Sequence, residues 1–244
     1  MSNEGILKLV LTIVLSVAVL TFIVVSIILS KKRGTKVSTK FMTRTAIFAA
    51  LSTILYVVPF LKFRLPFFPS FLEVHLDEIP LLMAGFAYGP WSGIFALLIK
   101  TIIKLPLSTT MCVGELADFV YSLFFVVPAA LFYKKHRNFV GALIALLIGM
   151  ISQIIAASFI TTFLILDFYM FVMGLPREAI IGAIQKAGIM IDDLTWPFFI
   201  MVGVPFNAFK DAIVVIVTIL LYKRFKIILE KIASWKSTKK PDWT

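Results

Sequence analysis

The sequence predicts an all-α integral membrane protein with six membrane-spanning core helices and one extra N-terminal transmembrane helix. The composition is the first reason, because 60% of the 244 residues are hydrophobic and only 15% are charged, whereas soluble domains have about 45–50% apolar and about 25% charged residues. The length of the apolar runs is the second reason, since several reach the ~20 residues that a helix needs to cross a bilayer. Short strands of alternating polarity, as in a transmembrane barrel, are not seen in the sequence.

The first apolar run, ILKLVLTIVLSVAVLTFIVVSIILS at 6–30, is followed by the basic linker KKRGTKVSTK. It is too long for the apolar region of a signal peptide, which has about 7–15 residues, and no small-residue cleavage site follows it. We therefore expect residues 1–42 to form a membrane anchor and its linker. Residues 43–226 should form the six-helix membrane domain, and residues 227–244 a basic cytoplasmic tail.

The apolar run at 79–105 is interrupted by YGPW, which contains Gly89 and Pro90. As one span, this run would place the basic segments 31–44 and 134–137 on opposite sides of the membrane, although cytoplasmic loops are enriched in Lys and Arg. A turn at Gly89 and Pro90 instead places both segments, and the basic tail, on the cytoplasmic side. Segments 31–44, 134–137 and 223–240 together hold sixteen of the 24 Lys and Arg residues. Gly at a helix end and Pro at a helix start suit such a turn.

The predicted core spans are therefore 43–61, 79–88, 90–105, 115–133, 139–166 and 197–222. Three segments then lie on the outer side of the membrane, 62–75, 106–114 and 167–196. The last of them contains EAIIGAIQKAG, starting at Glu178, whose pattern indicates an amphipathic helix at the membrane interface.

Two carboxylates, Glu115 and Asp118, occur in TTMCVGELADFVY at the outer end of a predicted span. Being three residues apart, they share one face of a helix. Acids are favourable in the first turn of a helix, so both could simply lie there near water. Ionisable groups inside a membrane segment, however, usually mark a ligand or ion pathway or a buried pair. Both interpretations remain open at this point.

The last span contains VPFNAFKDAIVV, with Asn207, Lys210 and Asp211 in apolar surroundings. Each such group would cost about 2.5–3.5 kcal/mol if it faced lipid, so we expect these side chains to face the interior of the bundle. A Lys–Asp pair that only holds helices together would not need Asn207, whose carboxamide both donates and accepts hydrogen bonds. We therefore favour a polar wall for a ligand.

Other functional classes find little support in the sequence. Glu73, His75, Asp77 and Glu78 could ligate a metal, but their spacing matches no metal motif, and acids before a helix are ordinary.

The single cysteine, Cys112, excludes an internal disulfide and a cysteine-built metal site. The net charge of +11 is explained by membrane topology rather than by nucleic-acid binding. No nucleophile–base pair or phosphate-binding loop is present, so we predict no enzyme, no catalytic residue, no metal and no cofactor.

Aromatic residues are frequent in the predicted outer segments. Interfacial aromatic belts account for many of them, and a flat aromatic ligand would also stack on such side chains. They are Phe63, Phe67, Phe68, Phe71, Phe168, Tyr169, Phe171 and Trp196.

The order of the segments LDEIPLLMAGFAYGPWSGIFALLIK, VGELADF, FVVPAALFYKK and VPFNAFKDAIVVIVTILLYKRF resembles a known family over about residues 43–225. This family comprises the substrate-binding S components of energy-coupling-factor (ECF) vitamin transporters, and the riboflavin-specific branch looks most similar. The resemblance implies a subunit that captures riboflavin or a related flavin from the extracellular side. It also implies a multi-pass protein of the bacterial plasma membrane.

The resemblance further implies that this subunit catalyses no reaction and serves ATP-driven uptake. Its partners would be a transmembrane coupling subunit and two ATP-binding subunits, within the lipid bilayer. Another S component, for folate, pantothenate or another small nutrient, is the alternative. An intramembrane enzyme with Asp118 and Asp211 as a dyad is a less favoured one.

Site residues follow from the same resemblance. In the riboflavin branch the Asn and Lys of PFNxxK line the vitamin site, which implicates Asn207 and Lys210. Glu115 and Asp118 would lie at the wall or rim of the pocket, and Thr110, Phe68 and Trp196 complete the predicted substrate-binding set. The segment AIFAA supplies Ala46 and Ala50 for contact with the coupling subunit, because small residues four apart let two membrane helices approach closely. Ala49 could share that face.

Overall fold

The computed structural model describes residues 39–238 of the chain. The predicted anchor helix at 6–30 lies outside the described residues, as does the end of the predicted tail. The described part is helical, and its only β pairing is an isolated bridge between Phe63 and Val74 in the loop after the first helix. The predicted fold class, all-α, is therefore confirmed for residues 39–238.

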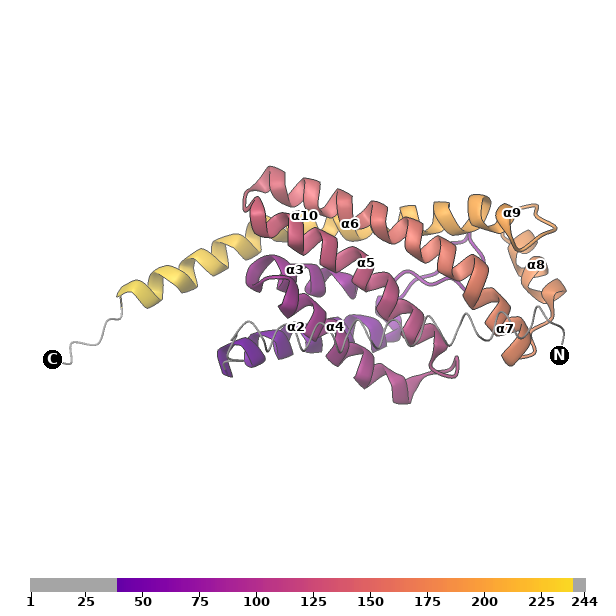
Figure 1. Cartoon of the computed structure of the whole chain (residues 1–244), viewed down its shortest axis with the longest axis horizontal. Coiled ribbons are helices and arrows are strands. Elements are labelled where there is room, and N and C mark those ends of the chain that lie inside the picture. The colour runs from indigo at the N-terminus through magenta and orange to yellow at the C-terminus, as the bar shows by residue number, and fades with distance from the viewer. Residues whose placement is uncertain (1–38, 239–244) are drawn as a thin grey trace.

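The helices follow one another along the chain with short connections, except for the loop after α2 (Figure 1). The run of α6, η3 and α7 is continuous, as is that of α9, η4 and α10, and both η3 and η4 are π-helical. The elements are α2 (Thr39–Val57), η1 (Pro59–Leu61), α3 (Glu78–Tyr88), α4 (Pro90–Lys104), η2 (Leu105–Leu107), α5 (Val113–Lys135), α6 (Phe139–Ile160), η3 (Thr161–Ile165), α7 (Leu166–Val172), α8 (Arg177–Lys186), α9 (Trp196–Phe198), η4 (Phe199–Gly203) and α10 (Val204–Thr238).

Each of the six predicted core spans corresponds to helical structure. Within residues 39–238, four segments are long and apolar enough to cross a membrane, namely Pro90–Leu107, Val113–Lys135, Phe139–Val172 and Trp196–Tyr222. The other two, Phe41–Val57 and Glu78–Tyr88, are shorter apolar helices. The segment predicted as an interfacial helix from Glu178 forms α8, which buries Ile180 and Ile184 and leaves the rest of its surface more exposed.

The predicted break at Gly89 and Pro90 separates α3 from α4. Gly89 has a φ of +97°, a region that glycine enters without the steric penalty of a Cβ. Its N–H donates to the Gly85 carbonyl and thereby ends α3, and Pro90 is the first residue of α4. The two helices pack against each other, with α2 and α5 as neighbours.

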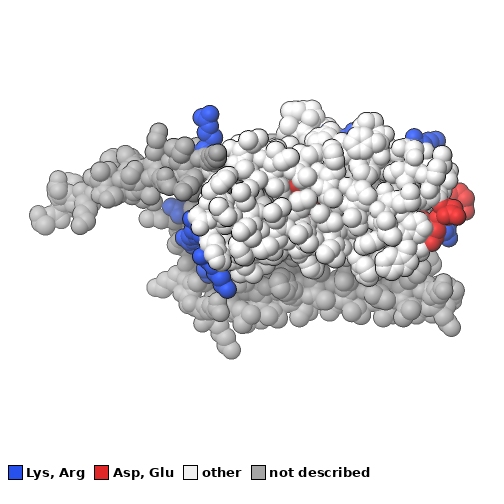
Figure 2. All heavy atoms as spheres, turned by 90° about the horizontal axis from the view of Figure 1, so that it is seen from above, with Lys and Arg blue, Asp and Glu red and all other residues white. Residues whose placement is uncertain are grey.

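The three segments predicted on the outer side come together at one end of the bundle. The loop after α2, the turn before α5, and α7 to α9 all lie at the right in Figure 1. The turn at Gly89 and the α5–α6 connection lie at the left, where α10 continues beyond the bundle. Figure 2 shows a nearly uncharged surface between these ends, with Lys and Arg at the left and a group of Asp and Glu, together with some Lys and Arg, at the right. This distribution is typical of a multi-pass membrane protein.

The apolar core lies between α2, α3, α4, α5, α6 and α10. Helices α5 and α6 approach closely at Gly149, where a Cβ atom would lie 2.6 Å from the carbonyl oxygen of Phe125. Near the C-terminal end of α5, the Tyr133 and Tyr222 hydroxyls are hydrogen-bonded at 2.8 Å, and Phe86 stacks on Tyr133. This end is filled by packed side chains, and the polar residues gather toward the other end.

Candidate ligand-binding site

A cavity of about 440 Å³ opens between the loop after α2 and the ends of the helices at the right of Figure 1. Its walls come from that loop, the turn before α5, α5 itself, the two π-helical regions and α10. This volume is within the range of small-molecule sites, which have about 300–1,000 Å³. Its lining carries both aromatic and charged side chains.

The turn before α5 holds Glu115 at the cavity wall. Met111 and Cys112 both have positive φ, +53° and +69°, and the Ser108 hydroxyl steadies this strained turn by accepting the N–H groups of Thr110 and Cys112 at 3.1 and 2.8 Å. Ser108 and Thr110 donate their hydroxyls to Oε2 of Glu115, at 2.6 and 3.0 Å. Among the described residues none donates to Oε1 of Glu115, which leaves that oxygen for a ligand.

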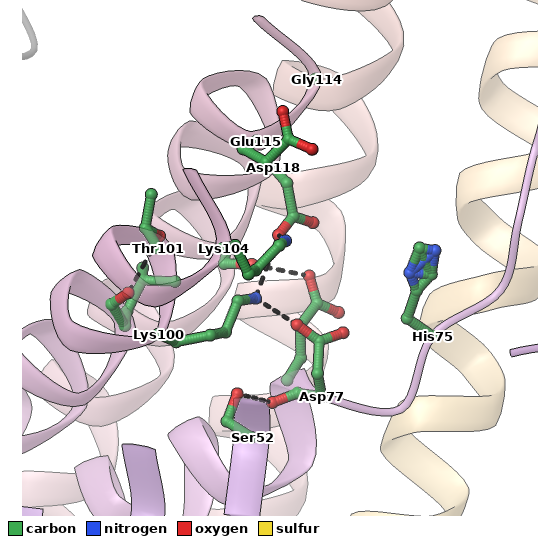
Figure 3. A network of polar contacts seen from close by, with 12 residues as sticks. Ser52, His75, Asp77, Lys100, Thr101, Lys104, Gly114, Glu115 and Asp118 are labelled. Carbon is green, nitrogen blue, oxygen red and sulfur yellow. Dashed lines mark hydrogen bonds and ion pairs between the residues drawn. The ribbon is translucent and has the colours of Figure 1, made fainter. Parts of the chain in front are cut away.

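Asp118, one turn further along α5, is held by two lysines of α4. Its Oδ2 accepts hydrogen bonds from Lys100 at 3.0 Å and Lys104 at 2.8 Å. Lys100 also donates to Asp77, the last residue before α3 (Figure 3). The Lys104 ammonium lies 3.0 Å from the centroid of the Tyr56 ring, a cation–π contact. Two acids and two lysines thus balance their charges in this cluster.

A second ion cluster contains one lysine and two acids. The Lys210 ammonium lies 3.1 Å from Oε2 of Glu78 and 3.0 Å from Oδ1 of Asp211. Oε1 of Glu78 accepts from the Ser122 hydroxyl at 3.1 Å and from the Gln153 carboxamide at 2.5 Å. Because an ammonium has three N–H groups, Lys210 keeps one for a ligand in the cavity that it lines.

Asn207 lies beside Lys210 on the cavity wall. Its Nδ2 donates to the Gly203 carbonyl at 2.9 Å and to the Ser158 hydroxyl at 3.2 Å. Both N–H groups are thus used, whereas no donor from the described part of the chain reaches the carbonyl oxygen Oδ1. Gly203 ends the π-helix η4, and Thr161 begins the π-helix η3; both line the cavity. Single π-helical turns occur often at functional sites.

Charged residues of the loop after α2 form the rim of the cavity. Arg64 and Glu73 are paired at 2.6 Å next to the bridge of Phe63 and Val74. Partial burial of Glu73 opposes its ionisation, but the hydrogen bond from Arg64 and the charges of Lys62 and Arg64 outweigh it and lower the pKa of Glu73. Burial lowers the pKa of His75, despite the opposing charges of Asp77 and Asp118. The rim therefore combines an ionised Glu73 with a neutral His75 at neutral pH.

Comparisons with known proteins identify the family. The profile of "ECF transporter, substrate-specific component" matches residues 40–222. The chain belongs to the S components of ECF transporters. It is similar to the riboflavin transporter RibU of Staphylococcus aureus (strain TCH60), with 31% identity over 183 residues that cover 75% of this chain and 89% of RibU. It is also similar to the riboflavin transporter FmnP of Bacillus subtilis (strain 168), with 26% identity over 77% of this chain and 94% of FmnP.

A solved structure of the S component of a bacterial ECF transporter has the same fold. It superposes with a TM-score of 0.59 at 26% sequence identity, over 78% of this chain and 97% of that one. The relatives named here are transporter components. The fold of this chain is thus that of an S component, as the order of its segments predicted.

The structure brings most of the predicted site residues of this S component together. Asn207, Lys210, Glu115, Asp118 and Thr110 all line the cavity. Their role in binding a ligand stays a prediction.

The structure places the two predicted aromatic residues elsewhere. Phe68 is buried behind the lining, between Phe67 and Phe206. Trp196, the first residue of α9, is 59% exposed, packs on Phe163 and Phe199, and is not among the residues that line the cavity. This position suits an aromatic side chain at the membrane interface.

Sequence patterns did not predict the roles of Lys100 and Lys104, nor that Asp77 and Glu78, which start α3 as expected, also pair with lysines. The two acids were interpreted as helix-start residues, but Asp77 makes no side-chain cap hydrogen bond, and both are buried partners of lysines. The available signal was ALLIKTIIK, in which two lysines four residues apart interrupt an apolar run. Such lysines need acidic partners inside the protein.

The predicted partner-binding residues lie on α2. Ala46 and Ala50 are exposed on one face of this helix, whereas Ala49 is fully buried in the core. Ala49 therefore does not share the face of Ala46 and Ala50. Among the described residues, no group of three or more His, Cys, Asp or Glu side chains is arranged to hold a metal ion.

Proposed function

We propose that this S component captures riboflavin, or a related flavin, in the cavity between the loop after α2 and α10. The observation that carries the proposal is the set of hydrogen-bonding positions that residues 39–238 leave unused. Oδ1 of Asn207 and one N–H of Lys210 remain on one wall, and one oxygen each of Glu115 and Asp118 remains on another. The similarity to two riboflavin transporters supports the same ligand.

A flavin matches these positions in chemical terms. The imide edge of its ring alternates carbonyl oxygens with an N–H, so Lys210 can donate to a carbonyl while Asn207 accepts the N–H. The ribityl hydroxyls are neutral donors, and the carboxylates of Glu115 and Asp118 can accept hydrogen bonds from them. Phe71, Tyr169 and Phe206 in the lining offer apolar and aromatic surface for the ring system.

In the membrane, the six core helices of residues 43–226 would cross the bilayer with the cavity on the extracellular side. The basic surface at the opposite end (Figure 2) supports this orientation in a bacterial plasma membrane, because cytoplasmic flanks are rich in Lys and Arg. Residues 1–42 would add an anchor helix and residues 227–244 a cytoplasmic tail.

The captured vitamin would be delivered to an energising module, made of a transmembrane coupling subunit and two ATP-binding subunits. The exposed Ala46 and Ala50 on α2 would contact the coupling subunit, because small side chains permit close helix packing in a membrane. The chain itself would catalyse no reaction. Asp118 and Asp211, the pair considered for an intramembrane enzyme, are bound to different lysines in separate clusters, which gives no support to a catalytic dyad.

The test is a titration of riboflavin with the detergent-purified protein, followed by the quenching of flavin fluorescence. We expect stoichiometric quenching with the wild type and weaker binding in Asn207→Ala and Lys210→Ala. Trp196→Ala is the matched control and should bind as the wild type, because Trp196 lies outside the cavity lining. No quenching at micromolar wild-type protein would overturn the proposal for flavins and direct the search to other vitamins.

A further inference from the structure

The two lysines that hold Asp118 bind the same oxygen of its carboxylate. Lys100 and Lys104 both donate to Oδ2, and within residues 39–238 no donor reaches Oδ1. The Asp118 side chain is 25% exposed and lines the cavity. One oxygen is therefore fixed by the protein, and the other is left for a ligand.

The lysines themselves do not line the cavity, although Asp118 does. Lys100 is 0% and Lys104 1% exposed. They can therefore act on a ligand only through Asp118, whose carboxylate they orient and keep charged. In Figure 3 both lysines reach Asp118 from α4, below Glu115 and away from His75.

The net charge of this cluster is zero without any ligand. Asp77 takes a further N–H of Lys100, so two carboxylates face two ammonium groups, and the Tyr56 ring covers Lys104. A buried ion pair is weak evidence for stability alone, because desolvation offsets most of the attraction. A balanced cluster that exposes one carboxylate oxygen is suited to a neutral hydrogen-bond donor, since a cationic ligand would approach two ammonium groups.

We propose that Lys100 and Lys104 are positioning residues that aim Oδ1 of Asp118 into the cavity, where it accepts a hydrogen bond from a neutral hydroxyl group of the ligand. The site then selects for a ligand that carries a polyol chain, and not only for its ring. This inference rests on the proposed function for the identity of the ring, and it assigns a role to residues that the ligand does not touch.

The test compares riboflavin with lumiflavin, which has the same ring but a methyl group in place of the ribityl chain. A hydrogen bond to a charged group contributes about 1.5–3 kcal/mol, so Asp118→Asn and Lys104→Met should each weaken riboflavin binding by roughly tenfold or more. Their affinity for lumiflavin should stay within about twofold of the wild type. Thr101→Val, next to Lys100 on α4, is the control and should change neither affinity.

A double-mutant cycle separates positioning from a general loss of structure. Lys104→Met should have little further effect on riboflavin affinity when Asp118 is already Asn, because the lysine acts through that carboxylate. Lys100→Met would leave Asp77 unpaired, so Lys100 is tested as Lys100→Met with Asp77→Asn, which removes one charge of each sign. This pair should again weaken riboflavin and spare lumiflavin.

The outcomes are distinct. If the wild type binds both flavins and the lysine variants weaken both equally, the lysines have only a structural role and this inference is wrong, while the proposed function stands. Unchanged riboflavin binding in Asp118→Asn would overturn the inference as well. If the wild type binds neither flavin, the proposed function fails, and the inference fails with it.

Discussion

The carboxylate of Glu78 and the ammonium of Lys210 lie 3.1 Å apart, although 132 residues separate them in the sequence. Glu78 begins α3 and Lys210 lies in α10, so this contact joins two distant parts of the chain at the cavity wall. Ser122 of α5 and Gln153 of α6 donate to the same carboxylate. Glu78 thus connects four helices at the wall of the candidate site.

Replacing either of the two acids that pair with Lys210 by its neutral amide should have opposite effects on stability. Glu78→Gln should lower the free energy of unfolding by about 1–3 kcal/mol, because three donors lose a charged acceptor. Asp211→Asn should leave stability unchanged or raise it, because two carboxylates share the single Lys210 and Oδ2 of Asp211 has no hydrogen-bond partner within the described residues. Thermal unfolding of the detergent-solubilised variants measures both. Equal losses in the two variants would contradict this ranking.

Gly114 is predicted to be required for ligand binding. A Cβ atom there would lie 2.6 Å from Oγ1 of Thr110, so Gly114→Ala should displace the hydroxyl that holds Glu115. We expect riboflavin affinity to fall by roughly tenfold, as for the loss of about 1.4 kcal/mol. Gly182→Ala in α8 is the control, since nothing lies within 4 Å of its Cβ. Equal affinity in both variants would show that the turn before α5 does not position the ligand.

Stability should depend on pH through His75. Burial lowers the pKa of His75 below its ordinary value of 6.5, so the folded state favours the neutral ring. The contribution of neutral His75 to the free energy of unfolding is fully present above pH 6.5. It decreases as the pH falls below that value toward the pKa of His75 in the folded state. The melting temperature should therefore fall between pH 7.5 and about 5.5, and less so in His75→Gln. Glu73, with a pKa lowered from 4.5, loses its contribution only as the pH falls below about 4.5, outside this window. A parallel fall in His75→Gln would refute the assignment.

Gly149 should tolerate no larger side chain. In Gly149→Val the new Cβ would lie 2.6 Å from the Phe125 carbonyl oxygen, and α5 and α6 would have to separate. Overpacking of this kind costs about 1–3 kcal/mol, which thermal unfolding detects. Leu147→Val, at an exposed position of α6, serves for comparison and should change stability by less than about 0.5 kcal/mol.

The proposed contact with the coupling subunit can be tested on α2. Ala50→Trp places a bulky ring on the exposed face of this helix, so we expect co-purification with the coupling subunit and uptake of riboflavin to decrease at least tenfold. Binding of riboflavin to the isolated subunit should be unaffected, because Ala50 does not line the cavity. Ile151→Trp, exposed on α6, is the matched variant and should retain both activities. Normal uptake in Ala50→Trp would exclude this face as the contact.

Helices and their order could be predicted from the sequence, and the partners of buried charges could not. Apolar runs, basic flanks and the pair Gly89 and Pro90 are local signals, and each was sufficient to place a helix or a break. Asn207 and Lys210 were found because polar residues in an apolar run must face inward. The pairing of Lys210 with Glu78, or of Lys100 with Asp77, depends on which helices are neighbours, and no local pattern contains that information. The position of Trp196 outside the cavity lining could not be predicted either, since an aromatic residue at a helix start suits a pocket and a lipid interface equally well.

The turn at Gly89 and Pro90 has a consequence for how the protein is made. Helix α3 has 11 residues and so a length of about 17 Å, which is too short to cross the roughly 30 Å hydrocarbon layer alone. Helix α4 carries Lys100 and Lys104, whose insertion alone would expose two charges to lipid. Joined by the turn, the two helices bring Asp77 to Lys100, whereas Lys104 meets its acid, Asp118, only when α5 follows. We therefore expect α3 and α4 to enter the membrane together as a helical hairpin, with one of the two lysine charges already neutralised.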